Sequence, residues 1–210
     1  MFGIINYPTF LLAGILLNLT PGSDTMYILG RSIAQGKKAG VLSALGISTG
    51  SLVHCLFAAL GLSILLAQSA VAFEVVKYAG AGYLIFLGVK SLMAKAEDSL
   101  TPDAVRGPAN YAKIYSSGIL TNVLNPKVAL FFLAFLPQFI DPRYAQNALP
   151  FLLLGLTFFV TGGIWCLLLA LFAARLSERL RAQPQIKVWL DRVTGGGFVL
   201  LGIKLALSEK

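Results

Sequence analysis

Six long apolar runs constrain this chain more than any other feature of its sequence. They are Tyr7–Gly30, Gly40–Ala67, Ala70–Leu92, Ile114–Ile140, Ala148–Ala173 and Val188–Leu207. About 20 apolar residues suffice to cross the hydrocarbon core of a bilayer as a helix. Charged residues make up only 12% of the 210 positions, against roughly 25% in soluble domains. The sequence therefore predicts an all-α membrane protein whose six transmembrane helices form a single domain, residues 1–210.

Basic residues predict how these spans are oriented. The net charge of +8 does not require nucleic acid as a partner, because lysine and arginine collect in the cytoplasmic loops of membrane proteins. The connections between spans 1 and 2, 3 and 4, and 5 and 6, with their helix ends, hold twelve of them: Arg31, Lys37, Lys38, Lys90, Lys95, Arg106, Lys113, Arg175, Arg179, Arg181, Lys187 and Arg192. The opposite side holds four: Lys77, Arg143, Lys204 and Lys210. We therefore expect a multi-pass protein of a bacterial inner membrane with both termini in the periplasm.

The first apolar run has no basic residue before Arg31 and precedes five further runs. A signal peptide begins with a positively charged segment. We therefore expect the first run to be a retained span.

The two groups of three runs on either side of a polar stretch resemble each other. Gly82, Gly88 and Lys90 have counterparts 114 residues later in Gly196, Gly202 and Lys204, and Thr20-Pro21 has one 105 residues later in Asn125-Pro126. A unit with an odd number of spans inverts when it is repeated, which is the plan of many secondary transporters. We therefore expect two inverted three-helix repeats, 1–92 and 114–210, joined by a cytoplasmic loop at 93–113.

A proline interrupts the first apolar run of each half. The segments are Asn18-Leu-Thr-Pro-Gly-Ser-Asp-Thr25 in span 1 and Asn122-Val-Leu-Asn-Pro-Lys127 in span 4. Proline removes a backbone hydrogen bond from a helix, and Thr20 and Asn125 are residue types that cap a new helix with proline at its first position. At about 1.5 Å per residue, both breaks lie near the middle of the membrane. Paired broken helices point to a transport site, while a packing kink is the simpler alternative for each proline.

The polar residues at the two breaks form the predicted substrate site: Asn18, Thr20, Pro21, Gly22, Asp24, Asn122, Asn125, Pro126 and Lys127. An ionised side chain at the centre of a membrane helix costs about 2.5–3.5 kcal/mol, so Asp24 and Lys127 need compensation. They could pair with each other, or Asp24 could face the ammonium of a zwitterionic substrate and Lys127 its carboxylate. Asp24 is also a candidate for proton coupling. So is His54, the single histidine, although a lone histidine in a helix is more often a packing residue.

The residues around both breaks resemble a known family. Asn18-Leu-Thr-Pro-Gly-Ser-Asp-Thr-Met26 is similar to the first signature of the lysine exporter superfamily, and Asn125-Pro-Lys-Val-Ala-Leu-Phe-Phe132 to the second. Both resemble the RhtB branch, the homoserine/threonine resistance exporters. Ser23 departs from the pattern, because the family often has a second proline there. The resemblance implies a six-helix exporter of amino acids and derivatives that is driven by the proton gradient, and it is compatible with a homodimer.

Three classes of function follow from these observations. The first is a secondary exporter of homoserine-like, threonine-like or other neutral or basic amino acids by proton antiport, with the substrate, protons and the lipid bilayer as its partners. The second is a passive channel, which needs an open polar pathway, whereas the polar positions here cluster at one depth. The third is a membrane-embedded enzyme, but no nucleophile–base pair, metal-ligand cluster or nucleotide-binding loop is visible, so we expect neither an enzyme nor a cofactor.

Overall fold

The computed structural model describes residues 2–62, 70–93, 109–182 and 184–207, and within these ranges the chain is almost entirely helical. An antiparallel bridge joins Ile4 to Ile140. The α-helices are α1 (Tyr7–Leu19), α2 (Ser23–Gln35), α3 (Lys37–Phe57), α5 (Ala70–Leu92), α6 (Tyr111–Val123), α7 (Pro126–Leu130), α8 (Ala148–Ala182) and α9 (Pro184–Leu207). Two π-helical turns, Ala58–Leu62 and Phe131–Phe135, and two 3-10 turns, Leu136–Phe139 and Pro142–Tyr144, complete them.

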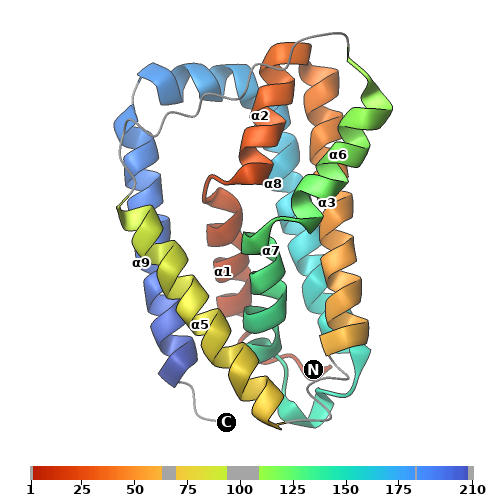
Figure 1. Cartoon of the computed structure of the whole chain (residues 1–210), viewed down its shortest axis with the longest axis vertical. Helices are drawn as coiled ribbons and strands as arrows, with labels where there is room; N and C mark the ends of the chain where they lie inside the picture. Colours follow the sequence, from red (N-terminus) through yellow and green to blue (C-terminus); the bar gives the residue numbers. More distant parts are fainter. Residues whose placement is uncertain (1, 63–69, 94–108, 183, 208–210) are drawn as a thin grey trace.

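In one bundle, α1 and α2 run upward, α3 downward, α5 upward, α6 and α7 downward, α8 upward and α9 downward (Figure 1). The start of α1 and the end of α9 lie at its lower end, whereas α3, α6 and α9 begin at the upper end. By length and apolarity, Lys37–Gly61 and Ala148–Ala173 can each cross a membrane, and the pair Tyr111–Val123 and Pro126–Phe139, bent by 46°, counts as a third span if it is taken as one. The chain is thus an all-helical, multi-pass membrane protein in its described part. Six spans in two repeats remain a prediction, and most of the predicted loop at 93–113 lies outside the described residues.

The break between α6 and α7 forms as its sequence predicts. Asn125 is the N-cap of α7, its side-chain oxygen accepts a 3.0 Å hydrogen bond from the backbone N–H of Lys127, and Pro126 occupies the first turn. An asparagine cap satisfies a backbone donor that has no partner within the helix. Proline is tolerated there because its missing N–H is one that the helix does not use.

The break between α1 and α2 differs from the prediction that Thr20 caps the second helix. The N-cap of α2 is Gly22, which has extended backbone angles, and α2 begins only at Ser23. Thr20 instead ends α1, and its hydroxyl donates a 2.8 Å hydrogen bond to the carbonyl of Leu16. A threonine that bonds back to its own helix is not available to cap the next one. The residues from Thr20 to Gly22 therefore form an extended link between two half-helices.

Helices α5 and α9 pack through glycines in a pattern that the two halves share. A Cβ atom added to Gly88 would lie 2.7 Å from the carbonyl oxygen of Gly195, and one added to Gly202 would lie 2.9 Å from that of Ala81. Gly88 and Gly202 are 114 residues apart, and so are Ala81 and Gly195. Exchanging the halves at this offset turns one contact into the other. A two-fold axis between inverted repeats produces this pattern, so it supports the predicted duplication.

Helix α3 packs closely against α6 through the glycines that its sequence spaces four residues apart. A Cβ atom on Gly46 would lie 3.1 Å from the Cα of Gly118, and one on Gly50 would lie 2.7 Å from the Cβ of Asn122. Small residues at such spacing let membrane helices approach backbone to backbone. This contact holds Asn122 next to α3.

Packed aromatic rings lie on one side of the breaks and a hydrogen bond between helices lies on the other. Below them, six buried phenylalanines from α1, the turns after α7, and α8 pack against one another, with ring centroids as close as 4.8 Å for Phe135 and Phe139: Phe10, Phe131, Phe132, Phe135, Phe139 and Phe158. Above them, the hydroxyl of Tyr27 on α2 donates a 2.7 Å hydrogen bond to the carbonyl of Ile114 on α6. Between them, Asn122 and Asn125 are buried, and Asn18, Asp24 and Lys127 are half-buried.

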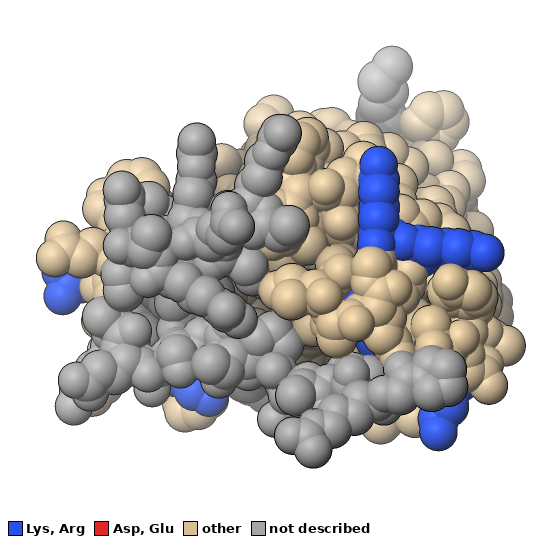
Figure 2. Space-filling view, turned by 90° about the horizontal axis from the view of Figure 1, so that it is seen from above, with Lys and Arg blue, Asp and Glu red and all other residues tan. Residues whose placement is uncertain are grey.

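The upper face carries basic side chains (Figure 2). Lys37 and Lys38 at the start of α3 and Lys113 at the start of α6 are exposed. No acidic side chain of the described residues is visible in this view. The positive charge of this face agrees with the prediction that it lies on the cytoplasmic side.

Candidate functional site

Lys127 joins the two broken helices. Its ammonium donates hydrogen bonds of 2.9 Å to the carbonyl of Leu17 and 2.8 Å to the carbonyl of Thr20. The carbonyl of Leu17 would normally accept from the N–H four residues on, but Pro21 has none. A lysine from the second half therefore satisfies backbone acceptors that a proline frees in the first half, at the negative end of the α1 dipole.

Asp24 is held by a polar residue of the opposite half. Its carboxylate accepts a 2.8 Å hydrogen bond from the side-chain amide of Asn122, which is only 2% exposed. Asp24 also lies in the first turn of α2, where the helix dipole favours a negative charge. In the described ranges, the ion pair within 4.0 Å joins Arg143 to Asp141. Asp24 and Lys127 therefore do not form the direct ion pair that was one of the two alternatives from the sequence.

At the break between α6 and α7, His54 binds a backbone carbonyl, as Lys127 does at the break between α1 and α2. Its Nε2 donates to the carbonyl of Asn122 at 3.1 Å, and its ring stacks on Phe132 with centroids 5.7 Å apart. Pro126 leaves this carbonyl without the N–H that a continuous helix would supply, and the carbonyl also accepts a 2.9 Å hydrogen bond from the backbone N–H of Asn125. Leu17 and Asn122, whose carbonyls are freed, are 105 residues apart. The two halves thus satisfy equivalent carbonyls with Lys127 and His54 respectively.

A small cavity of about 20 Å³ lies between Asp24 and Lys127. Asn18 lines it, as do Trp165 and Cys166 from α8, which sequence reasoning did not place at the site. The signal for Trp165 was an aromatic residue with a polar N–H in the middle of an apolar span, two residues after Gly162-Gly163. The volume suffices for about one water molecule, and an amino acid is several times larger. The site is therefore closed in this conformation.

Several buried polar atoms of the cavity wall and of the break between α6 and α7 lack a hydrogen-bond partner among the described residues. They are the amide nitrogens of Asn18 and Asn125, the amide oxygen of Asn122 and the indole nitrogen of Trp165. Buried polar groups are nearly always satisfied in native structures, so each unsatisfied one calls for an explanation. These four atoms supply three donors and one acceptor for water or a ligand.

The remaining predicted residues shape this region without side-chain hydrogen bonds of their own. A Cβ atom on Gly22 would lie 3.3 Å from the ammonium of Lys127, so glycine lets the lysine reach the link between α1 and α2. Pro21 and Pro126 free the two carbonyls. In the described ranges, no group of three His, Cys, Asp or Glu residues could hold a metal ion.

Comparison with known proteins gives the chain its family. The family model described as LysE type translocator matches residues 15–209. The chain belongs to the LysE type translocator family. An uncharacterized membrane protein of Pseudomonas aeruginosa is 31% identical to this LysE type translocator over 209 residues, covering 98% of this chain and 97% of the relative. The homoserine/homoserine lactone efflux proteins of Salmonella typhimurium and Salmonella typhi are each 33% identical over 200 residues, covering 95% of both chains.

The family confirms the resemblance that the two signatures carried, and it identifies a transporter, not an enzyme. No solved structure matches this LysE type translocator.

Proposed function

We propose that this LysE type translocator exports an amino acid or a close derivative, such as homoserine, from the cytoplasm by proton antiport. Membership of the family and the names of the Salmonella relatives, homoserine/homoserine lactone efflux proteins, support export of this class of compound. The observation that carries the proposal is the crossed pair of contacts at the breaks. Lys127 of the second half binds carbonyls of the first, and Asn122 of the second half binds Asp24 of the first.

A zwitterion can replace each of these contacts with one of its own. Its carboxylate would take the ammonium of Lys127, and its ammonium would take the carboxylate of Asp24 and the carbonyls of Leu17 and Thr20. The amides of Asn122 and Asn125, each partly unpaired, would complete the hydrogen bonds. The protein contacts that hold the two half-helices together are thus the ones that a substrate would compete for. Binding would loosen the closed arrangement, as alternating access requires.

Proton coupling would act through the same carboxylate. Either a proton or the ammonium of a substrate can neutralise Asp24, but both cannot do so at once. Exclusive occupancy of one site by two ligands couples their movements in opposite directions. A proton would therefore enter as the amino acid leaves, with both chain termini and the lower end of Figure 1 facing the periplasm.

A passive channel is less well supported by the same geometry. A channel needs a continuous polar path, whereas the cavity between the charged residues is about 20 Å³, with a phenylalanine layer on one side. An exporter with an enclosed site fits this arrangement.

Uptake into proteoliposomes with an imposed pH gradient tests the proposal. We expect saturable movement of homoserine or a related amino acid against its own gradient, abolished when the pH gradient is collapsed. In Asp24→Asn, gradient-driven movement should be lost while exchange of labelled for unlabelled substrate survives in part. Flux that does not saturate would identify a channel, and an unchanged proton-driven rate in Asp24→Asn would remove Asp24 from the mechanism.

Cys166 offers an independent test of where the substrate binds. It lines the cavity, and Cys55 is the other of two cysteines, so Cys55→Ala leaves Cys166 as the single thiol. A transported amino acid should slow the labelling of Cys166 by a small thiol reagent. A non-transported amino acid of equal charge is the control. Equal labelling with and without substrate would place the binding site elsewhere.

A further inference from the structure

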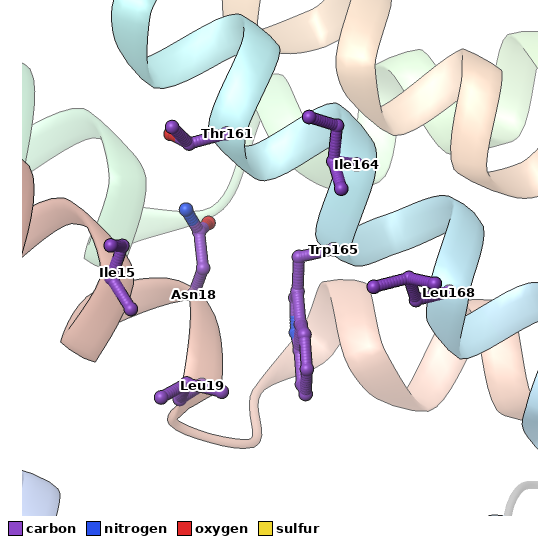
Figure 3. A pocket seen from close by; sticks show the side chains of 7 residues that line it. All are labelled: Ile15, Asn18, Leu19, Thr161, Ile164, Trp165 and Leu168. Carbon is purple, nitrogen blue, oxygen red and sulfur yellow. The ribbon is translucent and has the colours of Figure 1, made fainter.

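A second pocket lies on the flank of the bundle between α1 and α8, where Figure 3 shows its side chains. Its volume is about 220 Å³. Most of its wall consists of four aliphatic side chains, Ile15, Leu19, Ile164 and Leu168. None of the residues that line it is acidic or basic. The pocket opens on the flank, where Ile15, Ile164 and Leu168 are 40%, 56% and 42% exposed, and its volume exceeds that of an enclosed apolar cavity of roughly 150 Å³ that takes up benzene.

This pocket adjoins the cavity between Asp24 and Lys127. Asn18 and Trp165 belong to the walls of both, and in Figure 3 the Asn18 amide and the Trp165 indole project into the space between α1 and α8. The amide nitrogen of Asn18 and the indole nitrogen of Trp165 are both without a hydrogen-bond partner among the described residues. A ligand that spans the two spaces would therefore meet two free donors, the Asn18 amide and the Trp165 indole, at the junction between its polar head group and its side chain.

The chemistry of the two spaces selects different parts of one molecule. The inner cavity presents a carboxylate and an ammonium, which suit a zwitterion. The outer pocket has an apolar lining, so burying a charged group there would cost free energy without an ion-pair partner. Each methylene group transferred to such a lining gains about fourfold in affinity. The two spaces together favour an amino acid with an uncharged, extended side chain.

We propose that the pocket between α1 and α8 is the side-chain subsite of this transporter and that it selects aliphatic amino acids over basic ones. The inference rests on the proposed amino-acid export and deepens it. Trp165 separates the head group from the side chain, and Leu168 sets the depth available to the side chain. The pocket admits roughly four to six carbon atoms. Lysine, whose carbon chain equals that of norleucine, is excluded by its terminal ammonium.

Export of norleucine, lysine and homoserine from proteoliposomes tests the subsite. Norleucine should have an apparent affinity roughly tenfold or more above that of lysine. Leu168→Trp fills the pocket and should lower the norleucine-to-homoserine ratio of transport at least fivefold, whereas Leu168→Ala should keep or raise it. Val160→Trp, at a 52% exposed position of α8 outside the pocket, is the matched control and should leave the ratio unchanged. A ratio is independent of how much of each variant is inserted.

The outcomes separate this inference from the function on which it rests. If no amino acid moves, the proposed export fails. If homoserine moves but lysine equals norleucine, or if Leu168→Trp lowers all substrates alike, the side-chain subsite is overturned. In that case the pocket is a lipid-facing groove filled by an acyl chain.

Discussion

The side-chain amide of Asn122 donates a 2.8 Å hydrogen bond to the carboxylate of Asp24, across 98 positions of the chain. This bond and the bonds from Lys127 to Leu17 and Thr20 cross between the halves. The bond from His54 to the carbonyl of Asn122 runs in the opposite direction, so each half contributes a side chain to the broken helix of the other.

Asn122→Asp should make transport strongly dependent on pH. Two carboxylates would then face each other at hydrogen-bond distance, and like charges this close cannot both be ionised without a large cost. At neutral pH the pair repels and transport should fall at least tenfold. At low pH one carboxyl group is protonated and can donate the lost hydrogen bond, so transport should partly recover. Asn122→Ala is the control: it should be impaired at every pH, and a matching recovery there would refute the explanation.

Lys127→Met should abolish transport and lower stability. Methionine preserves most of the chain length but leaves two buried carbonyls without a donor, which costs roughly 1–3 kcal/mol for each group. Thermal unfolding in detergent would measure the loss, and export in proteoliposomes would measure the function. Lys113→Met, at an exposed position near the start of α6, is the matched control and should change neither transport nor stability. Normal transport by a well-inserted Lys127→Met protein would reduce the break to a packing kink.

His54→Gln separates a structural histidine from a proton relay. Glutamine retains a donor that can reach the carbonyl of Asn122 but cannot bind and release protons in this pH range. If His54 only satisfies that carbonyl, His54→Gln should transport within about threefold of the original rate. His54→Leu should be less stable by roughly 0.5–1.5 kcal/mol, because the carbonyl loses its side-chain partner and keeps only the bond from the backbone N–H of Asn125. Loss of proton-driven transport with retained exchange in His54→Gln would instead assign the proton to His54.

Glycine substitutions test the contact between α5 and α9. Gly88→Ala and Gly202→Ala should each destabilise the protein by about 1–3 kcal/mol, because the new methyl groups meet backbone atoms that cannot move aside. Gly82→Ala and Gly196→Ala are matched controls in the same two helices, since a Cβ atom there meets nothing within 4 Å among the described residues. Unfolding in mixed micelles would measure all four. Equal effects at the four positions would contradict the packing described.

Reporter fusions test the proposed orientation. Alkaline phosphatase joined after Ser99 should be inactive, because the 93–113 loop is expected in the cytoplasm, and joined after Lys210 it should be active. The motivating observation is the distribution of basic residues, twelve against four, with the basic upper face in Figure 2. The reverse pattern would invert the topology, and equal activity at both positions would contradict the odd number of spans, three, that we expect between Ser99 and Lys210.

Local features of the site were predictable from sequence, and long-range ones were not. Asn125 caps α7 as expected because a cap depends on its own helix alone. Thr20 was misassigned because the Pro21-Gly22 link can extend before the next helix starts, which residue types do not reveal. The need to compensate Asp24 and Lys127 was correctly inferred from the cost of buried charge. Their partners, an amide and two carbonyls of the opposite half, follow from how α2, α6 and α7 pack. Trp165 was missed because an aromatic residue in an apolar span usually marks packing.

The two glycine contacts between α5 and α9, Gly88 with Gly195 and Gly202 with Ala81, have a consequence for the free energy of the transport cycle. When two repeats trade conformations, an interface that maps onto itself has the same free energy in the inward-facing and outward-facing states. It cannot bias the cycle in either direction. Asymmetry must arise where the duplication has diverged, and Asp24 and Lys127 are such places, since their counterparts 105 residues away are Ala129 and Gly22. A preference for one of the two states would then originate in two side chains that the repeat does not copy, whereas the gradients of proton and substrate set the direction of transport.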